Sequence, residues 1–180
     1  MAQRGFEVMI KIAVTGPEST GKSTLAKDLA KYFKINAVPE YAREYLKNFA
    51  GDYTIDDVIT IAEGQQKLIS EREMQNPNIL IADTELIVCK IWTEYVYNTT
   101  PDFIEKALSK QKFDFYLLCD IDLPWTYDPL RENPNLDERK DLFQRYKSQL
   151  DKMKAPYGIV SGSGETRFQN ALNHIKPLLK

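Results

Sequence analysis

The sequence contains few residues of the kinds that build disulfide frameworks or metal centres. Its 180 residues include two cysteines and one histidine. Cys89 and Cys119 stand in apolar surroundings without the spacing of metal ligands, so we expect two reduced, buried thiols. His174 lies in the last predicted helix, where a surface or packing role is expected rather than catalysis.

Long apolar runs and a strong charge imbalance are absent as well. No run approaches the roughly 20 apolar residues that a membrane-spanning helix needs, and the first eight residues lack the apolar core of a signal peptide. The formal net charge of -2 gives no general electrostatic reason to expect nucleic acid or an anionic membrane as a partner. We therefore expect a cytoplasmic protein with a small-molecule substrate. The sequence does not indicate the oligomeric state.

The overall composition is typical of a globular domain. The hydrophobic fraction of 43% and the charged fraction of 28% are ordinary, and the chain is long enough to bury a sizeable core. The sequence predicts a single domain over residues 9–180, preceded by a short tail of residues 1–8.

The stretch from residue 10 to residue 29 is the most informative part of the chain. An apolar, β-branched run is followed by G-P-E-S-T-G-K-S and then by a segment with helical period. The spacing G-x-x-x-x-G-K-[ST] is that of a phosphate-binding loop, or P-loop. Backbone N–H groups of such a loop point at phosphate oxygens, and the following helix adds the positive end of its dipole. A glycine-rich turn without a ligand is the alternative.

The residues of this loop have expected parts in binding ATP and Mg²⁺. Lys22 can reach the β- and γ-phosphates, and the Ser23 hydroxyl can ligate Mg²⁺. The residues expected to contact the nucleotide here are Gly16, Glu18, Ser19, Thr20, Gly21, Lys22, Ser23 and Thr24.

Short apolar runs alternate with helical segments along the rest of the chain. The five expected strands are residues 10–15, 35–38, 79–82, 115–119 and 157–161. One expected helix begins near residue 22, and others span residues 41–49, 84–97 and 138–153. A further helix follows a capping box of Thr54 and Asp57, another follows Thr100-Pro101, and a final helix comes last. This alternation predicts an α/β fold with a mostly parallel sheet covered on both faces.

Charged residues follow two of these strands, and the carboxyl ends of parallel strands meet at one edge of a sheet. Asp83 ends the third run, where a carboxylate could hold Mg²⁺ or act as a base, or could cap the next helix. Glu40 and Arg43 follow the second run. A carboxylate there could bind or deprotonate an acceptor hydroxyl, and a guanidinium could clamp an anionic group. A surface ion pair is the alternative.

The segment of residues 120–137 has three prolines and no periodicity. Its length favours a functional loop, and we expect a lid at about residues 122–140. Arg131 and Arg139 flank the segment and could close over the γ-phosphate, because phosphoryl transfer depends on positioning and charge stabilisation. Solubilising charge on a loop and a helix is the alternative for both.

Aromatic residues could form a wall for a planar ring. The candidates are Trp92, Tyr95, Tyr97 and Trp125, although such stripes belong to the core more often than to a ligand site.

Five motifs together resemble a known family. They are G-P-E-S-T-G-K-S at 16–23, P-E-Y-A-R-E at 39–44, G-Q-Q at 64–66, I-A-D-T-E at 81–85 and W-T-Y-D-P-L-R at 125–131. From about residue 9 onward, the chain resembles the ribosylnicotinamide kinase domain of NadR-type NAD-biosynthesis proteins, an AAA-like ATPase/kinase. The P-loop alone would indicate only a P-loop protein, and the other motifs in this order make the resemblance specific.

The resemblance implies an activity and a set of site residues. It implies a P-loop kinase fold, a three-layer α/β/α sandwich with a parallel five-stranded sheet. It also implies Mg²⁺- and ATP-dependent phosphorylation of the 5′-hydroxyl of nicotinamide riboside to nicotinamide mononucleotide. The acceptor would contact Glu40, Tyr41, Arg43, Gln66, Asp83, Trp92 and Asp128. By analogy, Gly162 and Gly164 would lie against the adenine. Either Glu40 or Asp83 is the base, and the sequence does not choose between them.

The family also has members with more domains than this chain. Fuller members carry an adenylyltransferase domain, and some a DNA-binding domain, so we expect this chain neither to make the dinucleotide nor to bind an operator. Two other functions stay open: another small nucleoside or nucleotide kinase, and a regulatory ATPase that acts through a partner. A monophosphate acceptor would need more cationic groups than Arg43 provides.

Overall fold

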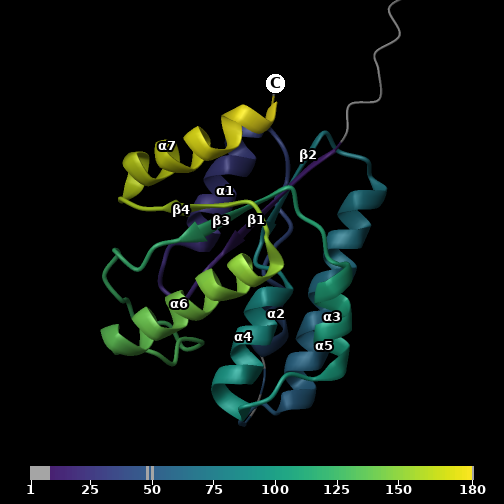
Figure 1. Ribbon diagram of the computed structural model, residues 1–180, viewed down its shortest axis with the longest axis vertical. Helices are drawn as coiled ribbons and strands as arrows, with labels where there is room; N and C mark the ends of the chain where they lie inside the picture. Colours follow the sequence, from purple (N-terminus) through teal and green to yellow (C-terminus); the bar gives the residue numbers. More distant parts are fainter. Residues whose placement is uncertain (1–8, 48, 50, 180) are drawn as a thin grey trace, which may run out of the picture.

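The centre of the fold is a parallel sheet of four strands (Figure 1). In the order in which they pair, the strands are β2 (Ile79–Asp83), β1 (Ile10–Thr15), β3 (Phe115–Cys119) and β4 (Tyr157–Val160). This computed structural model describes residues 9–47, 49 and 51–179, and the predicted tail of residues 1–8 lies outside the described residues.

The predicted fifth strand, at residues 35–38, is wrong. Only Val38 pairs with the sheet, through an isolated parallel bridge to Ala82. Its N–H donates to the Ile81 carbonyl at 2.8 Å, and its carbonyl accepts from Asp83 N at 2.9 Å. The pairing is limited to this residue, and the chain enters helix α2 three residues later, at Tyr41. The bridge still directs the chain after Val38 to the carboxyl edge of the sheet.

Helices cover both faces of the sheet (Figure 1). Helices α1 (Lys22–Phe33) and α7 (Gly164–Ile175) pack on one face, and α7 continues into a short 3₁₀ helix, η1 (Lys176–Leu179). Helices α3 (Ile55–Met74), α4 (Leu86–Tyr97), α5 (Asp102–Lys110) and α6 (Leu136–Met153) pack on the other. Side chains of β1 alternate between the two cores, with Ile12 and Val14 in the first and Ala13 in the second. The result is a three-layer α/β/α arrangement.

Side chains cap the first turns of α3, α4 and α6. The predicted capping box of Thr54 and Asp57 is confirmed at the start of α3. Helix α6 begins at Leu136, two residues before the predicted start, because the Asn135 side chain caps it. Helix α2 (Tyr41–Leu46) is shorter than predicted, and residue 48 of the predicted span lies outside the described residues.

Two further expectations concern thiols and membranes. Cys89 and Cys119 are buried and unbridged, as predicted. Among the described residues, no helix combines the length and the apolar character that crossing a bilayer requires.

Candidate active site

The P-loop connects β1 to α1, and its glycines are required by close packing and backbone conformation. Gly16 has a φ of 130°, and a Cβ placed on it would lie 2.9 Å from the Cys119 carbonyl oxygen of β3. Gly21 has a φ of 75° and is the N-cap of α1. Other residues would strain the backbone at either position. The loop therefore curls tightly against the end of β3.

Two side chains bridge the P-loop across its own turn. Lys22 Nζ donates to the Pro17 carbonyl at 2.6 Å, and Thr20 Oγ1 donates to the same oxygen at 2.7 Å. The ammonium group thus lies over the loop at the N-terminus of α1, where positive charge favours a phosphate ligand.

Asp83 is the last residue of β2 and lies near Lys22 and Ser23 of the P-loop. Its side chain is 6% exposed, and its Oδ1 has no hydrogen-bond partner among the described residues. Burial raises the pKa of Asp83, and the nearby Ser23 hydroxyl and Lys22 ammonium oppose this shift. A buried carboxylate oxygen without a partner beside a hydroxyl is a donor set that suits Mg²⁺.

The alternative for Asp83, a helix cap, is wrong because Glu85 caps α4. Glu85 Oε2 accepts from Ile87 N at 2.7 Å and from Gln111 Nε2 at 2.8 Å, and Oε1 accepts from Thr15 Oγ1 at 2.9 Å. Glu85 is fully buried, and burial raises its pKa. Sequence reasoning missed this residue, which ties α4 to the last residue before the P-loop.

Glu40 and Arg43 begin helix α2, close to Asp83. Glu40 is the N-cap of α2. Burial is the largest cause of the raised pKa of Asp83, and the negative charge of Glu40 raises it further. Arg43 Nε lies 3.6 Å from Glu40 Oε2, and its Nη1 donates to Asp128 Oδ2 at 3.0 Å. The predicted ion pair of Glu40 and Arg43 therefore exists. Arg43 also joins α2 to the β3–α6 loop (residues 120–135) through Asp128.

The G-Q-Q motif supports the start of α2. Gln65 is buried, its Oε1 accepts from Tyr41 N at 2.8 Å, and its Nε2 donates to the Pro39 carbonyl at 3.2 Å. A Cβ on Gly64 would lie 2.2 Å from the Tyr41 ring, so only glycine fits there. The predicted contact of Gln66 with the acceptor stays a prediction, and sequence reasoning missed the supporting role of Gln65.

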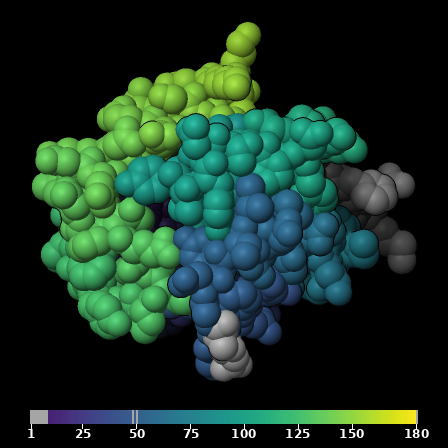
Figure 2. All heavy atoms as spheres, turned by 90° about the horizontal axis from the view of Figure 1, so that it is seen from below, coloured from purple at the N-terminus to yellow at the C-terminus, as the bar shows by residue number. Residues whose placement is uncertain are grey.

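The β3–α6 loop folds onto the P-loop through Glu18. The Glu18 carboxylate accepts from Trp125 Nε1 at 3.0 Å, from Glu132 N at 2.9 Å and from Asn133 N at 2.7 Å. Seen from below in Figure 2, green atoms of this part of the chain lie beside the blue atoms of α2 and α3, with purple atoms from early in the chain between them.

Arg131 also lies in the contact between the β3–α6 loop and the P-loop. Its Nη1 donates to the Thr126 carbonyl at 2.6 Å and lies 3.4 Å from Ser19 Oγ, which in turn accepts from Thr126 N at 3.0 Å. Arg131 therefore lies beside the P-loop, as the lid hypothesis expects of its position.

Arg139 differs from its expected place. It is 5% exposed on the buried face of α6, and its Nε and Nη1 have no partner among the described residues. Because α6 begins before this residue, Arg139 belongs to a packed helix. It is neither solubilising surface charge nor part of the irregular loop. Its catalytic role stays a prediction.

The four aromatic residues predicted to form a wall make contacts in different places. Trp92 Nε1 donates to Tyr53 OH at 2.9 Å, Tyr53 OH donates to Glu132 Oε2 at 2.8 Å, and Tyr97 OH donates to the Tyr53 carbonyl at 3.0 Å. Trp125 binds Glu18 instead. Tyr95 packs elsewhere, 5.6 Å from the guanidinium carbon of Arg145. Sequence reasoning missed Tyr53, which links α4 to the β3–α6 loop.

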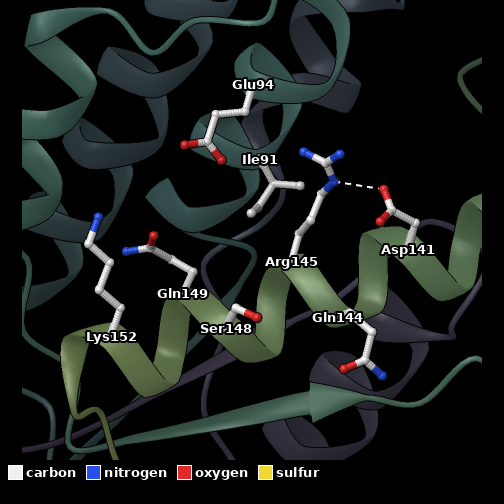
Figure 3. A pocket seen from close by; sticks show the side chains of 8 residues that line it. All are labelled: Ile91, Glu94, Asp141, Gln144, Arg145, Ser148, Gln149 and Lys152. Atoms are coloured by element: carbon white, nitrogen blue, oxygen red, sulfur yellow. Dashed lines mark hydrogen bonds and ion pairs between the residues drawn. The ribbon is translucent and has the colours of Figure 1, made fainter.

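A separate groove of about 340 Å³ lies between α4 and α6 (Figure 3). Three of its charged side chains are paired, with Arg145 Nε 2.7 Å from Asp141 Oδ2 and Glu94 Oε1 2.8 Å from Lys90 Nζ. Of the described residues predicted for the active site, none lines this groove. The edge of the sheet at the P-loop therefore stays the candidate site.

Comparison with known proteins gives the family. A protein family described as an AAA domain matches residues 11–167. The chain belongs to this AAA domain family. The matched part of the AAA domain runs from β1 into α7 and so includes the P-loop, Asp83 and the β3–α6 loop.

Curated relatives confirm the resemblance to NadR-type proteins. The chain is 27% identical over 135 residues to the trifunctional NAD biosynthesis/regulator protein NadR of Escherichia coli (strain K12), covering 73% of this chain and 33% of the relative. The protein of the same name from Salmonella typhimurium is 27% identical over 133 residues, covering 72% and 32%. The chain thus spans about a third of the length of these relatives.

Solved structures confirm the P-loop kinase class of the fold. The crystal structure of NadR protein in complex with NR has a TM-score of 0.73 and 26% identity, covering 94% of this chain and 51% of that one. Thymidylate kinase from Ehrlichia chaffeensis has a TM-score of 0.68 and covers 94% of this chain and 98% of its own. Its identity of 15% shows the fold alone.

Proposed function

We propose that this chain is an ATP-dependent kinase that phosphorylates the 5′-hydroxyl of nicotinamide riboside to nicotinamide mononucleotide. The observation that carries the proposal is the buried Asp83 carboxylate beside Lys22 and Ser23 of the P-loop. The acceptor is inferred from the similarity to NadR protein solved in complex with NR.

The residues of the site have distinct proposed roles. Ser23 and Asp83 would hold Mg²⁺, which when bound would neutralise charge on the β- and γ-phosphates. Lys22 stabilises the transferring phosphoryl group. Because Asp83 serves as a ligand of Mg²⁺ in this proposal, Glu40 at the start of α2 orients the acceptor hydroxyl and receives its proton. The β3–α6 loop excludes water from the site.

The cationic ring of nicotinamide riboside fits the acidic and aromatic character of the acceptor side. Trp92, Tyr53 and Glu132 are joined by hydrogen bonds there, and Asp128 and Glu40 lie on either side of Arg43. Aromatic faces and carboxylates attract a cation.

ADP release with and without an acceptor tests the proposal. We expect strong stimulation by nicotinamide riboside and little by other nucleosides or by monophosphates. Stimulation by a different acceptor would keep the kinase mechanism and overturn the substrate. If ATP binds and no acceptor stimulates release, the chain is a regulatory ATPase and the proposal fails.

Replacing Arg131 by alanine is expected to lower kcat by about 100-fold, with a small change in the unfolding temperature. The guanidinium lies beside Ser19 and stabilises charge that develops on the transferring group, and removing one such donor typically has an effect of this size. Steady-state kinetics measure it. Arg145→Ala is the matched control, because Arg145 is an exposed arginine paired with Asp141 away from the site. Equal losses in both variants would contradict the role of Arg131.

A further inference from the structure

Arg167 in the first turn of α7 connects the loops that follow three adjacent strands. Its Nη2 donates to the Thr20 carbonyl of the P-loop and to the Asp120 carbonyl after β3, both at 2.8 Å. Its Nη1 donates to Asp122 Oδ1 at 2.7 Å and to the Gly162 carbonyl after β4 at 2.6 Å. The side chain is 4% exposed.

Asp122 completes this connection. While Oδ1 receives Arg167, Oδ2 accepts from the Gly162 backbone N–H at 2.5 Å. The guanidinium and the carboxylate therefore hold both the N–H and the C=O of one residue in the turn after β4. Such charge-assisted hydrogen bonds are stronger than neutral ones and fix the geometry of the groups they join.

The guanidinium also lies directly behind the P-loop. A Cβ placed on Gly21 would lie 3.8 Å from Arg167 Nε. A planar group with five donors can serve several carbonyls at fixed angles, whereas a lysine ammonium cannot reproduce this fork. Burying the charge is costly unless such partners compensate it. The arrangement is therefore specific to arginine.

We propose that Arg167 and Asp122 form a clamp that sets the spacing between the P-loop and the Gly162 turn, and that this spacing determines the affinity for ATP. Arg167 is a positioning residue that contacts no ligand. The inference rests on the ATP binding of the proposed function, with the phosphates on the P-loop, and on the analogy with related kinases that would place the turn at residues 162–164 against the adenine. It does not depend on the acceptor.

The test compares MgATP with magnesium tripolyphosphate, which has no base and needs only the P-loop. Dissociation constants are measured by calorimetry on the full chain. Asp122→Asn removes the carboxylate that accepts from the Gly162 N–H and keeps the Arg167 bonds to Thr20 and to the Gly162 carbonyl. We expect its dissociation constant for MgATP to rise about tenfold, with that for tripolyphosphate unchanged within about twofold. Arg167→Lys also loosens the P-loop and should weaken both ligands.

Controls separate positioning from loss of stability. Asp141→Asn removes an exposed carboxylate that pairs with Arg145 and should change neither constant. Thermal unfolding of every variant shows whether it is folded at the assay temperature. If Asp122→Asn weakens ATP and tripolyphosphate equally, or weakens neither by more than about twofold, the clamp is contradicted.

This test is independent of the proposed kinase reaction. Selective loss of ATP affinity in Asp122→Asn would support the clamp even if no acceptor stimulated ADP release in the unaltered protein. Conversely, nicotinamide riboside-dependent turnover with no selective loss of ATP affinity would support the kinase and overturn the clamp.

Discussion

Replacing Lys22 by alanine is expected to lower nicotinamide riboside-dependent ADP release by about 1,000-fold. The Lys22 ammonium lies over the P-loop, 2.6 Å from the Pro17 carbonyl, at the positive end of α1. From there it can follow the charge that moves onto the β–γ bridging oxygen during phosphoryl transfer, and losing a preorganised charge of this kind costs two to three orders of magnitude in rate. Single-turnover kinetics at saturating MgATP measure the effect on chemistry directly.

Lys31→Ala is the matched control for this variant. Lys31 lies in the last turn of the same helix and is exposed, so its removal changes the net charge equally without touching the P-loop. We expect full activity from it. If Lys22→Ala retained more than about a tenth of the activity, the P-loop would not be the site of transfer.

Replacing Asp83 by asparagine should remove most of the activity and stabilise the fold by about 1 kcal/mol. The Asp83 carboxyl group is buried, and its Oδ1 has no partner among the described residues. Burial raises its pKa in the folded state, so the ionised group destabilises the folded protein above that pKa. Asparagine removes the charge at similar volume. It also removes the anionic oxygen that Mg²⁺ needs, so kcat should fall by at least about 100-fold.

The sign of the pH dependence makes this prediction sharper. As the pH falls through the raised pKa, the unaltered protein takes up a proton at Asp83 and loses the penalty, so the stability advantage of Asp83→Asn should shrink. Chemical denaturation of both proteins at a series of pH values measures the difference. An advantage that grows as the pH falls, or an active Asp83→Asn variant, would contradict the role of Asp83.

The parts of the fold that depend on local pattern were predictable. The bounds of β1 and β3 agree with the predicted strands, because each is a mostly apolar run of strand length. The segment at residues 35–38, I-N-A-V, is also mostly apolar but forms only one bridge, since pairing requires a neighbouring strand in register along its length. Strand pairing is a tertiary property, and a short run does not report it.

Some parts of the candidate site were predictable from local pattern, and others were not. The P-loop follows from glycine and lysine spacing, whereas Arg167 and Glu85 are buried by groups distant in sequence. Arg167 meets Thr20 and Asp120, 147 and 47 residues away, and Glu85 meets Thr15, 70 residues away. The sequence around a charged residue at or near the start of a helix gives no sign of such partners. Arg139 shows the same limit, because it was expected near the surface and is buried.

Identification of the phosphorylated product is the most direct test of a kinase at this edge of the sheet. Nicotinamide riboside and MgATP labelled at the γ-phosphate are incubated with the protein, and the products are separated and examined by mass spectrometry and ³¹P NMR. We predict label on the 5′-oxygen of nicotinamide mononucleotide, in equal amount to the ADP formed and absent with Lys22→Ala. Label recovered only as inorganic phosphate would contradict the account, because it would show hydrolysis without transfer.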